Sequence, residues 1–239
     1  MKRILLANTA LIALGGQVFA ADMAVKAPPA PPASQYNWTG CYVGADIGGG
    51  WGREGFTDPT GVNFLPPGVA VDVDSSGVLG GPEAGCNYQI APNWVVGISG
   101  DFAFADIKGS ARDPFFANKN IESKTEWLAS ATGQVGYTWD RWMLYGKGGA
   151  AWTRDRYDTT NPGVYDFNGT ETRTGWTAGV GLQWAFLQNW SAKVEYDHYD
   201  FGSGTFTLVD VNLGPQPATV KQQIDAVKFG VDYRFGAFP

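Results

Sequence analysis

The sequence predicts an all-β chain folded as an eight-stranded antiparallel barrel that crosses a membrane. Bulky apolar residues alternate with small or polar ones over eight segments of about ten residues each. Very short turns alternate along the chain with stretches of roughly twenty residues. Large aromatics bracket three of the short turns: Tyr88 and Trp94, Trp139 and Trp142, Trp184 and Trp190. Because Trp and Tyr gather at the lipid headgroups, these brackets indicate hairpins at a membrane edge.

The N-terminal residues predict export. Lys2 and Arg3 precede an apolar run, and small residues follow at Val18 and Ala20, as in a cleaved signal peptide. The run is shorter than the roughly 20 residues of a spanning helix. We therefore expect a signal peptide over 1–20, a Pro-rich periplasmic leader over 21–37 and an outer-membrane barrel over 38–239. Loss of Lys2 and Arg3 leaves 15 basic and 23 acidic residues, a net charge of −8, which argues against a nucleic-acid partner.

The eight alternating segments follow one another from residue 41 to residue 235. They cover 41–51, 77–89, 94–104, 126–139, 142–152, 176–184, 190–197 and 227–235. About ten residues suffice for a tilted strand to cross a bilayer. The polar face carries many glycines, which suit a narrow lumen better than the water-exposed face of a lipocalin-like barrel, the soluble alternative.

The connections predict which side each end of the barrel faces. Short turns lie near 91–93, 140–141 and 187–189, and four long stretches, 53–75, 108–124, 155–173 and 202–221, show no sustained period. We interpret them as periplasmic turns and extracellular loops. The predicted interface girdle consists of Tyr88, Trp94, Trp139, Trp142, Trp184, Trp190, Tyr233 and Phe235. Its counterpart at the other edge consists of Trp51, Trp127, Trp152 and Trp176.

Charged residues occupy the face predicted to line the lumen. They are Asp46, Glu83, Asp101, Glu126, Lys147, Lys193, Glu195, Asp197, Lys228, Asp232 and Arg234. An unpaired buried charge is costly, so we expect these groups to pair across the barrel as a stabilising plug. The alternative is a narrow ion path, in which the acidic excess would favour cations.

Two cysteines and one histidine complete the candidate chemistry. Cys41 and Cys86 fall on the predicted lipid face, where they could form a cross-strand disulfide or remain two free thiols. His198 lies at a strand end near Ser203, which would suit a lipid-modifying enzyme only with a nucleophile and base in reach. A boundary role is the simpler interpretation. No cofactor, metal site or catalytic residue is predicted.

Four motifs resemble one known family. They are 37–44 (NWTGCYVG), 144–149 (LYGKGG), 189–196 (NWSAKVEY) and 227–235 (VKFGVDYRF). Together they are similar to the alphaproteobacterial outer-membrane immunogenic proteins, porin-like barrels of the OmpA-type transmembrane class. The resemblance implies a surface-exposed envelope protein, and some relatives are described as porins or as contributing to envelope integrity and host contact. The chain departs from the family pattern at two places. Cys41 stands where the family often carries an aromatic residue. The last strand of outer-membrane barrels commonly ends the chain on an aromatic residue, whereas here residues 236–239 follow Phe235.

The combined prediction is a non-enzymatic outer-membrane protein with surface loops, at most a narrow cation-preferring channel. The alternative is a binding or adhesion module whose loops engage host or envelope ligands. The expected partners are outer-membrane lipids, lipopolysaccharide and the outer-membrane assembly machinery, and no nucleic acid.

Overall fold

The computed structural model describes residues 36–57, 70–112, 120–161, 165–210 and 214–235. The predicted signal peptide, most of the predicted leader and residues 236–239 lie outside this part of the chain. No helix among the described residues is long and apolar enough to cross a membrane.

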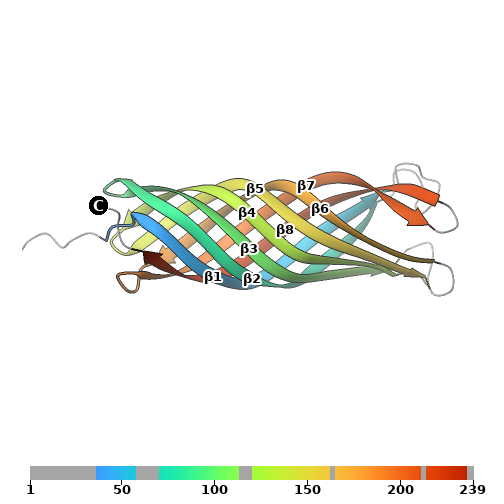
Figure 1. Ribbon diagram of the computed structural model, residues 1–239, viewed down its shortest axis with the longest axis horizontal. Helices are drawn as coiled ribbons and strands as arrows, with labels where there is room; N and C mark the ends of the chain where they lie inside the picture. Colours follow the sequence, from blue (N-terminus) through green and yellow to red (C-terminus); the bar gives the residue numbers. More distant parts are fainter. Residues whose placement is uncertain (1–35, 58–69, 113–119, 162–164, 211–213, 236–239) are drawn as a thin grey trace, which may run out of the picture. The chain divides into compact units, whose positions relative to one another are not determined.

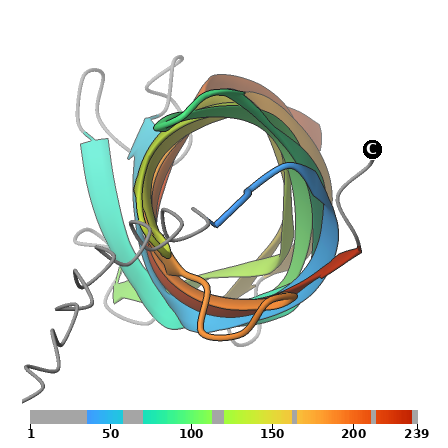
Figure 2. The same cartoon turned by 90° about the vertical axis from the view of Figure 1, so that its left-hand side faces the viewer.

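Eight antiparallel strands form one closed barrel (Figures 1 and 2). They are β1 (Gly40–Thr57), β2 (Ala70–Ala91), β3 (Trp94–Arg112), β4 (Asn120–Trp139), β5 (Trp142–Asn161), β6 (Tyr165–Trp184), β7 (Trp190–Asp210) and β8 (Gly214–Phe235). Each strand pairs with its neighbours in sequence, and β1 pairs with β8. The predicted fold class is confirmed.

The strands tilt strongly around the barrel, as its register shows. A row of partners that starts at Trp51 passes through Asp225, His198 and five further strands, and it returns to β1 at Cys41. The displacement along β1 is therefore ten residues, from 51 to 41. A stagger of this kind is what closes a sheet into a barrel, and it leaves an eight-stranded interior that side chains fill.

The strands are longer than the sequence predicted, at 18 to 22 residues. The strands extend into the four stretches predicted as loops. β1, β3, β5 and β7 continue to Thr57, Arg112, Asn161 and Asp210, and β2, β4, β6 and β8 begin at Ala70, Asn120, Tyr165 and Gly214. The outer faces of these extensions carry exposed polar side chains such as Arg53 on β1, Asp74 on β2, Lys108 on β3 and Arg154 on β5. With polar residues on both faces, these strand portions lack the apolar alternation that reveals a strand.

The outer surface consequently has two parts. Beside the short turns it is apolar, with Ile47 and Ile98 each 69% exposed, and we call this part the apolar band. Beyond the row of Trp51, Phe104 and Trp176 the outer surface becomes polar, and we call these strand portions the distal half. The apolar band suits lipid contact, whereas the distal half suits water.

A β-bulge changes the side-chain alternation of β4. The pairing with β5 shifts between Thr125 and Trp127, which leaves Glu126 as an extra residue. Leu128 and the even-numbered residues after it face inward, whereas Ser123 and Thr125 face inward before it. One inserted residue reverses the face of every side chain beyond it.

Candidate functional site: the barrel interior

The interior contains four successive layers of side chains. Along β5 these are Met143 in an apolar cluster at the short-turn end, Lys147 in a charged layer, Ala151 in an apolar layer and Asp155 in a polar layer. All four residues are buried. The layers explain why both charged and apolar residues face inward on the same strands.

The cluster at the short-turn end includes a segment that precedes β1. Figure 2 shows the start of the described chain, in blue, crossing the barrel opening. Trp38 is 2% exposed and packs with Val95, Met143, Tyr145 and Ala185. Its backbone N–H donates to Gln89 Oε1 at 3.0 Å. The Trp38 side chain therefore occupies the opening of the lumen.

Tyr36 caps this cluster. The Arg234 guanidinium lies 4.4 Å from the centre of its ring, and that of Arg141 lies 5.9 Å away, so both can form cation–π contacts. The Tyr36 hydroxyl donates to the Gln188 carbonyl at 3.1 Å. Burial raises the pKa of this phenol above its ordinary value, against the lowering effect of the two guanidiniums. Tyr36 thus connects the segment before β1 to three other parts of the barrel rim.

Three lysines and six carboxylates form the charged layer. Lys147 pairs with Glu195 and, at 3.0 Å, with Asp197, while Lys193 pairs with Glu83. Lys228 lies 2.7 Å from Asp197 Oδ2 and 3.4 Å from Glu195 Oε1. Asp46, Asp101 and Asp232 line the same layer. Each lysine is shared among carboxylates, so removal of one cation would leave several buried charges without compensation.

A tyrosine, a glutamine and a glycine complete the charged layer. The Tyr145 hydroxyl donates to Glu195 Oε2 at 2.5 Å, and Gln183 donates to Asp232 Oδ2 at 2.7 Å. A Cβ placed on Gly181 would come within 2.3 Å of the Tyr145 ring. This inward-facing glycine leaves the room that the large interior side chain needs.

An apolar layer separates the charged layer from the distal half. It contains Leu79, Ala103, Ala105, Ile107, Leu128, Ala151, Tyr199, Phe201, Ile224 and Ala226. Ile107, Leu128 and Ile224 are each 1% exposed. Such a layer opposes ion passage because an ion would have to give up its water there.

The polar layer of the distal half contains interior residues that sequence reasoning missed. Ser123 donates to Glu54 Oε1 at 2.8 Å, and Thr125 donates to Asp155 Oδ1 at 2.7 Å. Gln222 donates to the same Asp155 oxygen at 3.0 Å. Thr153 and Asp155 occupy every second position of β5, which is the spacing of residues on one strand face. The residue between them is also polar, so this spacing did not stand out in the sequence.

The structure places most of the predicted lumen residues together. Asp46, Glu83, Asp101, Lys147, Lys193, Glu195, Asp197, Lys228 and Asp232 lie in the charged layer. Arg234 lies instead at the rim, against Tyr36. The placement of Glu126 in the lumen is wrong, because the bulge in β4 turns it outward, where it lies 3.4 Å from the half-exposed Arg154.

The predicted girdle residues are all exposed on the outside of the barrel. Trp142 stacks on Trp184 with ring centres 5.6 Å apart, and Trp190 contacts Tyr233 at 5.0 Å. These pairs lie at the short-turn end and mark one border of the apolar band.

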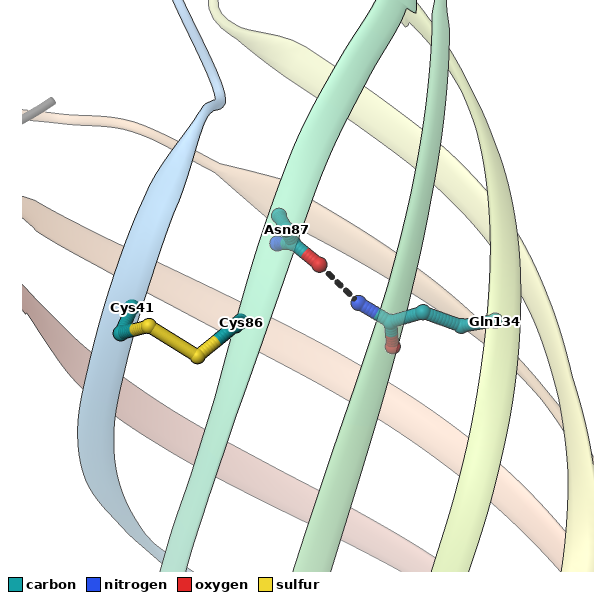
Figure 3. Close-up of a disulfide and its surroundings, with 4 residues drawn as sticks. All are labelled: Cys41, Cys86, Asn87 and Gln134. Atoms are coloured by element: carbon teal, nitrogen blue, oxygen red, sulfur yellow. Dashed lines mark hydrogen bonds between the residues drawn. A yellow bond between two sulfur atoms is a disulfide. The ribbon is translucent and has the colours of Figure 1, made fainter. Parts of the chain in front are cut away.

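The two cysteines are joined by a disulfide across β1 and β2 (Figure 3). They are register partners, and their side chains point to the outside of the barrel. Asn87, the next residue, points inward and accepts a hydrogen bond from Gln134 at 2.6 Å. Consecutive residues of β2 thus point to opposite faces of the barrel wall, Cys86 outward and Asn87 inward.

His198 lies on the outer face, away from the inward-facing Asp197 and Tyr199. Its Nδ1 is 2.8 Å from Asp225 Oδ1, which also accepts a hydrogen bond from the Tyr196 hydroxyl at 2.7 Å. The Trp176 ring lies 5.6 Å away. The polar side-chain partner of the His198 ring is thus the Asp225 carboxylate on β8 rather than Ser203. Within the described residues, no group of three or more His, Cys, Asp or Glu side chains could hold a metal ion.

Comparisons with known proteins agree with this geometry. The chain is 30% identical to the 31 kDa outer-membrane immunogenic protein of Brucella melitensis, over 98% of this chain and all of that protein. It is 28% identical to the 25 kDa outer-membrane immunogenic protein of Brucella abortus, over 98% and 99%.

Among solved structures, OprG from Pseudomonas aeruginosa shares the fold with a TM-score of 0.51 at 12% identity, over 83% of this chain and 98% of that one. The protease OmpT from Escherichia coli shares it with a TM-score of 0.52 at 11% identity, over 81% and 97%. Residues 18–235 match the family described as the outer membrane protein beta-barrel domain. The chain therefore belongs to this family of outer-membrane β-barrel proteins.

Proposed function

We propose that this protein is a non-enzymatic structural barrel of the outer membrane whose lumen is closed. The observation that carries the proposal is the apolar layer between the two polar parts of the interior, with Ile107, Leu128 and Ile224 almost fully buried. Trp38 adds a second obstruction at the short-turn end. Of the two interpretations of the lumen charges, this arrangement favours the stabilising plug over the cation path.

Planar-bilayer recording tests the closed lumen. We expect the native protein to show at most small, brief, cation-preferring openings. The double variant Leu128→Ser and Ile224→Ser should open more often, because hydroxyls allow water into the apolar layer. Trp38→Ala is the matched control, since it alters the opening and leaves that layer intact. Large, steady currents through the native protein would contradict the proposal.

The absence of enzymatic activity rests on the surroundings of His198. The His198 ring contacts the Asp225 carboxylate and the Trp176 indole, and neither group is a serine or cysteine nucleophile. Incubation with lipid A should therefore release no acyl chains. Release by the native protein, with loss in His198→Ala, would overturn this part of the proposal.

A surface binding module is the second candidate function. The distal half supports it, because strands that continue well past the apolar band present a polar surface outside the membrane. Deletion of residues 58–69 should then weaken attachment to a host or envelope ligand while the barrel remains folded. A closed structural barrel without a binding role would show no such dependence.

A further inference from the structure

The wall of the distal half is open between β6 and β7. Pairing of these strands runs from Trp184 with Ala192 to Trp176 with Asp200 and stops there. The β5–β6 pairing continues to Asn161 and Tyr165, and the β7–β8 pairing continues to Asp210 and Gly214. The two hairpins diverge at the right-hand end of Figure 1. We call the gap between residues 170–174 of β6 and 202–205 of β7 the seam.

Local features of β7 keep the seam from closing. The β7–β8 register shifts between Asp200 and Ser203, and Gly202 between them has a φ of +63°. The Gly202 N–H donates to Asp200 Oδ1 at 2.7 Å. A bulge with a left-handed glycine redirects a strand, so β7 follows β8 away from β6. The separation of β6 from β7 therefore begins at the bulge around Gly202.

Arg173 closes the inner side of the seam. Its guanidinium extends from β6 and donates to the Val220 carbonyl at 2.6 Å and to the Gly204 carbonyl at 3.5 Å. Phe201 and Gln222 are buried nearby. A molecule that enters the seam from outside would therefore meet the strand edges and would not reach the lumen.

We propose that the seam binds an extended polypeptide strand of a partner protein by β-augmentation. An unpaired strand edge presents a row of main-chain N–H and C=O groups. An added extended chain can form hydrogen bonds with each of these groups in turn. The outward side chains beside the seam are short and uncharged: Thr170, Thr172, Thr174, Ser203 and Thr205. On the two edge segments, 170–174 and 202–205, no long charged side chain, which commonly protects an exposed edge, faces outward. Arg154, Arg156 and Lys221 stand one strand away from the seam, opposite Thr172, Thr170 and Ser203. The inference deepens the second candidate function and does not depend on a closed lumen.

A synthetic peptide pair tests the chemistry. One peptide of about ten residues alternates Thr and Val, and the other has the same sequence with every second amide N-methylated. Binding to the full chain in detergent or nanodiscs should be detectable for the first peptide and at least about tenfold weaker for the second. Alternate N-methylation removes the main-chain donors along one edge of the peptide, and a strand between β6 and β7 needs both edges. No binding, or equal binding of both, would overturn the proposal. Dimers that the first peptide dissociates would show that a second copy fills the seam instead.

A cross-link locates the binding site. Thr172→Cys with Thr205→Cys, joined by oxidation or by a short bifunctional alkylating reagent such as a bismaleimide, closes the seam. Thr205→Cys with Thr219→Cys is the matched control, because these register partners already lie together with hydroxyls 3.1 Å apart. Binding should fall about tenfold in the first variant and persist in the control. Unchanged binding in the cross-linked first variant would place the peptide elsewhere and refute the seam. If that link does not form, the N-methylated pair still decides the question. A peptide result of either sign leaves the conductance test of the closed lumen unaffected.

Discussion

The two halves of the barrel are held together in different ways. In the half inside the apolar band, lipid surrounds the wall and a shared network of three lysines and six carboxylates fills the lumen. In the distal half, water surrounds the wall, ion pairs lie on the outside, and β6 and β7 separate. Removal of one partner from a buried charge pair is costly, whereas loss of a partner that water reaches costs little. The comparison predicts that the distal half can be altered without loss of the spanning half.

The largest effect is expected from Lys228→Met. This lysine contacts Asp197, Asp101 and Glu195, so its loss leaves buried carboxylates uncompensated and should lower the free energy of unfolding by about 3–5 kcal/mol. Urea unfolding in lipid vesicles, followed by tryptophan fluorescence, measures it. Lys108→Met removes an exposed partner of Asp106 and serves as the control. An equal loss of unfolding free energy in both variants would contradict the proposed difference between the two halves.

Loss of the disulfide should rank second. Replacement of Cys41 and Cys86 by Ser frees a connection of 45 residues between β1 and β2 and should cost roughly 2–4 kcal/mol. The same unfolding measurement applies, with the native protein under reducing conditions as the second arm. A stability identical to that of the oxidised protein would mean that strand pairing alone fixes the first hairpin.

Arg173→Met should affect the distal half alone. Without the hydrogen bonds to Val220 and Gln222, we expect a loss of about 1–3 kcal/mol that is confined to the strands beside the seam. Hydrogen exchange should become faster at 202–205 and 219–223 and stay unchanged at 190–197. Faster exchange throughout β7 would show that the two halves unfold as one unit.

The smallest effect is expected from Glu126→Gln. The carboxylate lies outside the barrel against a half-exposed arginine, so the change should be less than about 1 kcal/mol. Unfolding of this variant beside Glu83→Gln, whose carboxylate pairs with the buried Lys193, provides the contrast. A large effect of Glu126→Gln would restore the predicted lumen position.

Part of this architecture could be predicted from the sequence. Alternation in the apolar band revealed eight strands, their inner faces and the girdle, because one face there meets lipid and the other a narrow lumen. The same rule missed the distal strands, where the outer face is polar and the inner face mixes polar residues with a few apolar ones such as Val73 and Val220. It misplaced Glu126 because a single inserted residue leaves no mark on composition.

The sequence by itself determined the barrel class, the side of each membrane-facing residue and the candidates Cys41 and Cys86. It did so because a two-residue period is a local property of the chain. The tertiary structure alone decided which lysine meets which carboxylate, that Trp38 enters the lumen, and that β6 and β7 part beyond Trp176. These features depend on the stagger that brings residues distant in sequence to the same height of the barrel, and no local pattern encodes that stagger.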